Sequence, residues 1–91
     1  MDLHEALSAI QSATQVMFSA HARQRMNQRN VTRADVRHVL NHAVVDALKP
    51  GDEPDTWVVQ GTDLDEETLN VVLKIEVLLT GNARNVVLTV Y

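Results

Sequence analysis

The side chains best suited to chemistry in this 91-residue chain lie in one short segment, residues 20–29. His21, Arg25 and Arg29 are spaced four residues apart, so on a helix they line one side. Arginine binds phosphate through two parallel hydrogen bonds, and histidine can accept and donate a proton near neutral pH. This set fits cleavage of a phosphodiester backbone without a metal. The alternative is structural: an acid anchors Arg29 in the core, Arg25 is solvated and His21 packs.

Thr89 and Tyr91, at the end of the sequence, are the next candidates. They alternate along the expected last strand, so their side chains share one face of the sheet. Where that face meets the helix edge with His21, a hydroxyl and a phenol would join the cluster. The alternative is ordinary strand composition, since threonine and tyrosine are favoured in strands.

Basic charge is concentrated in residues 23–37. This segment holds five arginines against one acid, Asp35, which gives a net charge of +4 in a chain whose total is −4. It therefore predicts a basic surface on an acidic body. Arg23, Arg25 and Arg33 are the candidates for binding the phosphate groups of an anionic partner. A solvated helix face explains the charge equally well.

No cofactor or metal site is predicted. The chain lacks cysteine, which excludes disulfides, thiolate ligands and a cysteine nucleophile. His38 and His42 have the spacing of two helical metal ligands, but no glutamate follows the first and no third ligand is near, so we predict solvated histidines. The acids of residues 63–67 lack the glycine and alternating oxygens of a calcium loop and predict a solvated turn.

The elements that must position these residues begin with an amphipathic helix. Apolar side chains at intervals of three and four predict it over residues 2–16, with Asp2 as its cap. The chain has no proline or glycine before Pro50, which favours helices throughout this half.

Two further helices carry the basic segment. Ser19 is the expected cap of a helix over residues 20–29, which Asn30 ends. A capping box of Thr32 and Asp35 predicts the start of the third helix. Its buried face is expected to comprise Val36, Val39, Leu40 and Ala43.

The second half of the chain is expected to form strands. Residues 44–48 could be the last turn of the third helix or a strand, and a strand is the favoured prediction. We predict a loop at 49–55 and a strand at 56–61. Strict alternation predicts a long strand over residues 69–79, with one apolar face that runs from Leu69 to Leu79. A tight connection leads to a last strand, whose apolar face is expected to comprise Val86, Leu88 and Val90.

The fold class that follows is α+β, with N-terminal helices packed on one face of a three- or four-stranded antiparallel sheet. Length and a 45% hydrophobic content predict a single domain, residues 1–91. The acidic N-terminus lacks the features of a signal peptide, and no apolar run approaches the roughly 20 residues of a membrane span. We expect a cytoplasmic protein without membrane contact.

Residues 18–40 read F-S-A-H-A-R-Q-R-M-N-Q-R-N-V-T-R-A-D-V-R-H-V-L. This run resembles the signature of a bacterial family, domain of unknown function 4258. The family shows His-Ala-Arg, then Arg-Met, then Arg, a short turn and a capped helix that ends in Val-Leu. Its last strand ends in a Val-Thr-aromatic stretch, which L-T-V-Y fits. The resemblance covers residues 18–91 and leaves out the helix at 2–16.

The resemblance implies kinship with RelE/ParE-like and barnase-like ribonuclease toxins, in which helices pack against a four-stranded antiparallel sheet. The implied function is a toxin-like, metal-independent endoribonuclease, with RNA or the ribosome and an antitoxin-like protein as partners. Met26 would be a core residue. The implied catalytic set is His21, Arg25, Arg29, Thr89 and Tyr91. The chain departs from such toxins in charge, since they are often strongly basic.

Two other functions are compatible with the same residues. One is a non-catalytic interaction module of this fold, which binds a protein or RNA partner through the arginine-rich helix. The other is homodimerisation through a strand edge or the N-terminal helix, because an added amphipathic helix needs an apolar surface to cover.

Overall fold

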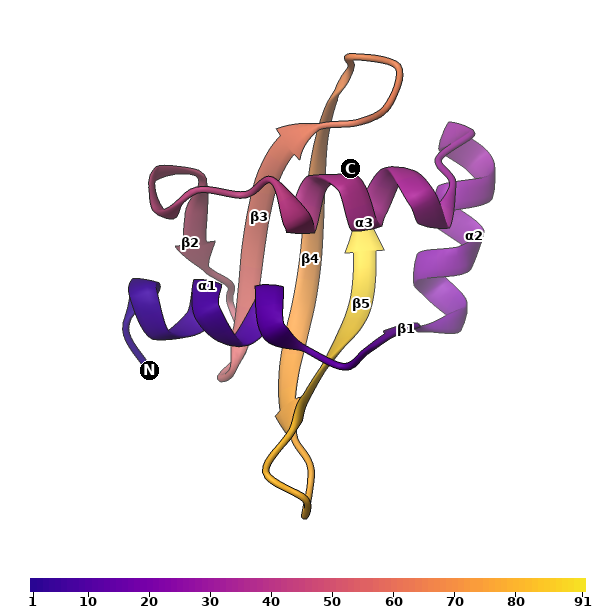
Figure 1. The fold of residues 1–91 in the computed structure, drawn as a ribbon. Helices are drawn as coiled ribbons and strands as arrows, with labels where there is room; N and C mark the ends of the chain where they lie inside the picture. The colour runs from indigo at the N-terminus through magenta and orange to yellow at the C-terminus, as the bar shows by residue number, and fades with distance from the viewer.

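Three α-helices pack against one sheet in the computed structural model, which describes residues 1–91 (Figure 1). The helices are α1 (Leu3–Ser12), α2 (Ala20–Arg29) and α3 (Arg33–Asn41), and a short 3-10 turn, η1, spans Val45–Ala47. The strands are β1 (Gln15–Phe18), β2 (Leu48–Pro50), β3 (Thr56–Thr62), β4 (Thr68–Val77) and β5 (Ala83–Val90).

The caps predicted for the helices are all present. Asp2 forms a capping box at the start of α1, and the Ser19 hydroxyl accepts a hydrogen bond in the first turn of α2. Asn30 ends α2 in the left-handed conformation (φ 56°, ψ 40°), which asparagine tolerates better than most residues. Thr32 and Asp35 then cap α3 reciprocally. These local signals place α2 and α3 at a sharp corner, with three residues between them.

The sheet has five strands in the order β1-β5-β4-β3-β2. Three of its pairings are antiparallel, and β1 pairs parallel with β5. The α+β class and the one-sided packing of helices are confirmed, while the expected three or four antiparallel strands were an approximation. The helix predicted over residues 2–16 ends at Ser12, because the β-favouring residues 16–18 pair with β5 instead.

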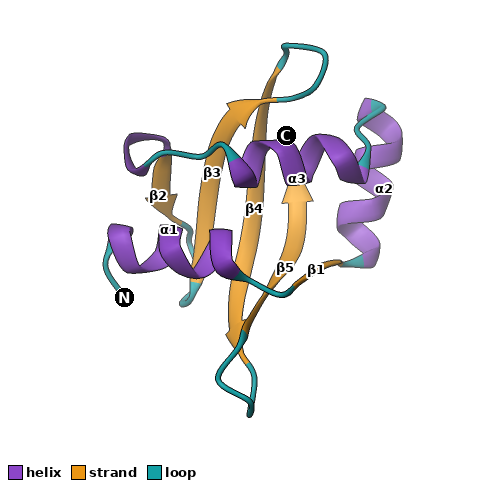
Figure 2. Ribbon diagram, viewed as in Figure 1, coloured by secondary structure: helices purple, strands orange, loops and turns teal.

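Helices α1 and α3 cover one face of the sheet, and α2 lies along its β5 side (Figure 2). Helix α3 comes close to β3 at Gly61, where a Cβ atom would lie 2.9 Å from the Val39 Cγ1. The core between the layers takes side chains from all three helices, chiefly Ala6, Ile10, Ala22, Met26, Val36, Val39 and Leu40. No helix has the length and apolar character needed to cross a membrane.

Two details of the strands differ from the prediction. The apolar face of β4 is buried only from Leu69 to Ile75, whereas Val77 and Leu79 are 70% and 110% exposed in the hairpin that protrudes from the body. In β5 a bulge shifts the register, so Val87 and Val90 face the core and Leu88 does not. Within the predicted face of β5, Val90 is confirmed as buried, whereas Val86 and Leu88 were wrong, because the bulge at Leu88 reverses the alternation between Val90 and the residues before it.

The segment at 44–48 was predicted as one strand and is instead divided. Residues Val45–Ala47 form η1, and β2 begins only at Leu48. The short β2 pairs with residues 57–59 of β3 and leaves the rest of β3 without a neighbour on that side. The turn at residues 63–67 lies where it was predicted, while the loop predicted at 49–55 begins only at Gly51, because Lys49 and Pro50 belong to β2.

Candidate functional site

Helix α2 exposes nearly all of its side chains. Only Ala22 and Met26 are buried, and Met26 is a core residue as expected. His21 and Arg29 are exposed and Arg25 is half-buried. No hydrogen bond or ion pair holds any of these three side chains, so the structural alternative for Arg29, an acid that anchors it in the core, is wrong.

The five arginines of α2 and α3 form what we call the arginine surface, and none of them has an acidic partner. Its members are Arg23, Arg25, Arg29, Arg33 and Arg37. The single salt bridge of the structure lies elsewhere, between the Arg84 Nε and the Glu76 Oε1 at 2.8 Å. The N–H groups of an arginine without an acidic partner are free to donate two parallel hydrogen bonds to phosphate oxygens.

Asp35 is the only acid in residues 23–37, the segment that carries the arginine surface. Its carboxylate already accepts hydrogen bonds from other groups. It is buried and accepts hydrogen bonds from the Thr32 backbone N–H at 2.9 Å, the Thr32 hydroxyl at 3.0 Å and the Leu64 backbone N–H at 3.1 Å. These bonds, led by that from the Thr32 backbone, outweigh desolvation and lower the pKa of Asp35. The charge of Asp35 therefore caps α3 rather than neutralising an arginine.

Sequence reasoning did not connect two other features with this surface. The Arg33 guanidinium lies 5.4 Å from the centroid of the Phe18 ring, a cation–π contact that depends on how β1 is placed. Helix α2 also exposes amide side chains beside its arginines. These are Gln24, Asn27 and Gln28, with Asn30 at the cap. The sequence feature that could have revealed these amides is the absence of any acid from Ala20 to Asn30.

Thr89 lies near the start of α2. The Ser19 hydroxyl donates a hydrogen bond to the Leu88 carbonyl at 3.0 Å, which attaches the first turn of α2 to β5. Thr89 pairs with Val72 and is half-buried. No hydrogen bond links Thr89 to His21, so the structure brings their elements together without joining the side chains.

Tyr91 lies farther from α2. Its backbone exchanges two hydrogen bonds with Asn70 of β4, at 2.8 and 2.9 Å. It lines a hollow of about 320 Å³ together with Lys49, Val58 and Val72, residues of β2, β3 and β4. These strands lie on the other side of β5 from α2 (Figure 1). A role for Tyr91 beside His21 stays a prediction.

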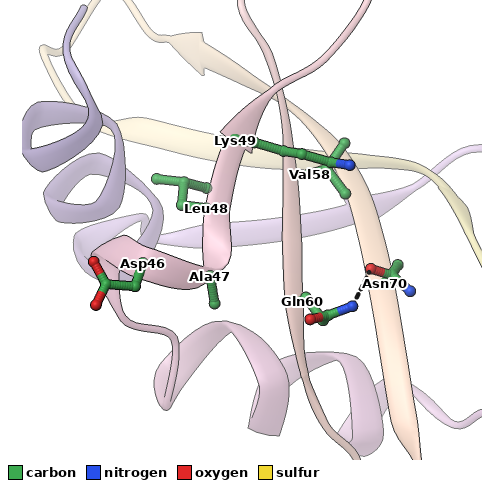
Figure 3. A pocket seen from close by; sticks show the side chains of 7 residues that line it. All are labelled: Asp46, Ala47, Leu48, Lys49, Val58, Gln60 and Asn70. Atoms are coloured by element: carbon green, nitrogen blue, oxygen red, sulfur yellow. Dashed lines mark hydrogen bonds between the residues drawn. The ribbon is translucent and has the colours of Figure 1, made fainter.

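A second hollow, of about 150 Å³, lies between η1, β2, β3 and β4 (Figure 3). Asp46 and Lys49 are its charged residues, and their charged ends point to opposite sides. The Gln60 amide donates to the Asn70 side chain at 3.3 Å, so these two amides satisfy each other. No set of polar groups converges there, and no group of three or more histidines, cysteines or acids gathers anywhere in the chain.

A family model matches residues 18–91, and its description is a domain of unknown function (DUF4258). The match contains the whole arginine surface and every strand except most of β1, and it leaves α1 outside. Neither a curated protein nor a solved structure matches the chain. By the match over most of its length, the chain belongs to the DUF4258 family.

Proposed function

We propose that this protein binds RNA through the arginine surface on α2 and α3. The observation that carries the proposal is that five arginines stand on two consecutive helices without one ion pair. Phosphate contacts from arginine supply most of the affinity in nucleic-acid binding. The acid-free exposed side of α2 adds amide donors that can reach base edges.

RNA suits this surface better than an acidic protein partner does. The guanidinium fork matches phosphate geometry, and the exposed amides of α2 offer both donors and acceptors, which bases use and a plain carboxylate does not. The chain has only three aromatic residues, so stacking on aromatic side chains, common in single-strand binders, contributes little. Binding would then depend mainly on charge and on the shape of the helix corner.

Cleavage of the bound RNA is the second candidate function. The side of α2 that carries His21, Arg25 and Arg29 is open to solvent, and its first turn is attached to β5 directly before Thr89. In this function Arg25 and Arg29 would hold the scissile phosphate while His21 transfers a proton. Thr89 would position the ribose. The expected kinship with RelE/ParE-like toxins would be consistent with such an activity.

One experiment tests both functions on the same labelled RNA oligonucleotides. Fluorescence anisotropy measures binding, and gel electrophoresis of the same samples with EDTA measures metal-independent cleavage. Arg29→Ala is expected to weaken RNA binding by about tenfold, or about 1.4 kcal/mol, because it removes an exposed guanidinium that donates hydrogen bonds to phosphate. His21→Ala is expected to reduce cleavage by about 10²–10⁴-fold and to leave binding nearly unchanged.

The matched control is Lys74→Ala, which removes one exposed positive charge from β4. An equal loss of affinity in this variant would show that the total charge matters and the arginine surface does not. Binding without cleavage by the wild type would leave the binding function and eliminate the nuclease. Absence of binding to any RNA at low salt would eliminate both.

A further inference from the structure

Two histidines lie one turn apart at the end of α3 and face each other. His38 is half-buried and His42 is exposed. Their ring centroids are 4.2 Å apart, with an interplanar angle of 34°. Residues four apart on a helix share one face, and this is the spacing of two helical metal ligands.

A backbone hydrogen bond sets the protonation of the His42 ring. The Nδ1 atom of His42 lies 2.9 Å from the carbonyl oxygen of His38. A carbonyl oxygen only accepts, so Nδ1 must carry the hydrogen, and in the neutral ring Nε2 keeps its lone pair. Metal-binding histidines commonly donate their other ring N–H to a backbone carbonyl in this way. The ring nitrogens of His38 have no hydrogen-bond partner.

Two features of the surroundings favour a cation at the pair, although Arg33 and Arg37 lie on the same helix. Both histidines lie in the last turn or cap of α3, where the helix dipole places partial negative charge. The buried Asp35 carboxylate is close enough for a charge on His38 to lower its pKa. The histidines border a hollow of about 280 Å³ between α3 and the unpaired part of β3, and no lysine or arginine lines it.

We propose that His38 and His42 together bind one divalent transition-metal ion of the zinc, nickel and copper class. Imidazole nitrogen selects these ions over magnesium and calcium, which prefer oxygen ligands. No third histidine, cysteine or acid is close enough to complete the site, so water fills the other positions. The site departs from the solvated histidines expected from the sequence, and it is independent of RNA binding.

Isothermal titration calorimetry with ZnCl₂ and NiCl₂ on protein without an affinity tag tests the site. The wild type is expected to bind one ion per chain. His38→Ala and His42→Ala are each expected to lower the affinity by about tenfold or more, since even outer-shell partners of metal ligands contribute that much. The other two histidines supply the controls, and His4→Ala and His21→Ala are expected to bind as the wild type does.

A second readout protects the result against misfolding of a variant. In ¹H–¹⁵N spectra, Ni²⁺ is expected to broaden the resonances of residues 38–43 and 60–62 of the wild type, which surround the hollow. No saturable binding of either ion would overturn the proposal. Broadening centred on other residues would also overturn it. An affinity loss in His4→Ala as large as that in His38→Ala or His42→Ala would place the ion at the N-terminus instead.

Discussion

Asp35 is the single residue on which the geometry of the arginine surface most depends. Its carboxylate caps α3 and also holds the backbone of Leu64, so it ties the turn at 63–67 to the start of the helix. Thr32 completes the capping box. A side chain that satisfies backbone donors of two distant segments contributes more than an ordinary cap, because its loss leaves both segments with unpaired N–H groups.

We expect Asp35→Ala to lower the free energy of unfolding by about 2–4 kcal/mol at pH 7, the combined scale of a lost cap and lost charge-assisted bonds. Urea denaturation followed by the fluorescence of Trp57 measures this change. Thr32→Ala, which removes the reciprocal half of the box, should cost about 1 kcal/mol. If Asp35→Ala and Thr32→Ala lowered the free energy of unfolding by the same small amount, the double role of Asp35 would be contradicted.

The same residue predicts how stability responds to acid. The pKa of Asp35 is lower in the folded protein than its ordinary value of 3.8, so its contribution is complete above that value. It is lost as pH falls from there through the folded pKa. The difference in unfolding free energy between wild type and Asp35→Ala should therefore be constant from pH 7 to pH 5 and should shrink below pH 4. A difference that stays constant to pH 2 would exclude a bound carboxylate.

At the scale of elements, α1 is part of the core although it lies outside the family match. Ile10 is buried, and its carbonyl accepts a hydrogen bond from the buried Asn85 amide at 2.9 Å. The Gln11 amide donates to carbonyls at the end of α3, closest to that of Ala43 at 3.0 Å. Helix α1 thus caps the end of α3 and covers β5. The oxygen of the Asn85 side chain has no hydrogen-bond partner.

Ile10→Ala should lower the free energy of unfolding by about 2–4 kcal/mol, the cost of a core cavity. Gln11→Ala should cost about 1 kcal/mol, the net worth of its hydrogen bonds. The control is Ser8→Ala on the exposed side of α1, expected to change stability by less than about 0.5 kcal/mol. Chemical denaturation of the three variants measures the differences. A neutral Ile10→Ala would show that α1 is only loosely attached.

The whole molecule separates its charges. The arginine surface sits on a chain with a net charge of −4, whose remaining acids are mostly in the loop after β2 and the turn at 63–67. The net negative charge outside the arginine surface is unfavourable for RNA, and the acidic turn borders that surface at the start of α3. This distribution favours a single, oriented mode of binding over general attraction to polyanions.

The salt dependence of RNA binding should therefore be limited in size. At most five arginines contact phosphates of the RNA. The slope of the logarithm of the binding constant against the logarithm of the salt concentration should therefore not exceed about 3.5 in magnitude for single-stranded RNA. Anisotropy titrations at several salt concentrations measure this slope. Arg29→Ala should reduce it by about 0.7 and Lys74→Ala should not change it. A slope that is identical in all three proteins would place the RNA elsewhere.

The sequence by itself determined the corner of α2 and α3 and the charge on it. Caps, a helix-ending asparagine and the absence of acids act within a few residues, so Ser19, Asn30 and Thr32 could be interpreted without any tertiary contact. The long alternation of β4 was equally local. The general α+β class followed from helices placed before strands.

Only the tertiary structure decided which side of β5 is buried, that β1 pairs parallel with it, and that Tyr91 lies toward β2 and β3. It also decided that Arg29 has no acidic partner. Each of these depends on register, a bulge or the meeting of residues far apart in the chain. Such pairings are set by the total burial of the folded state, and no local pattern of residues encodes them.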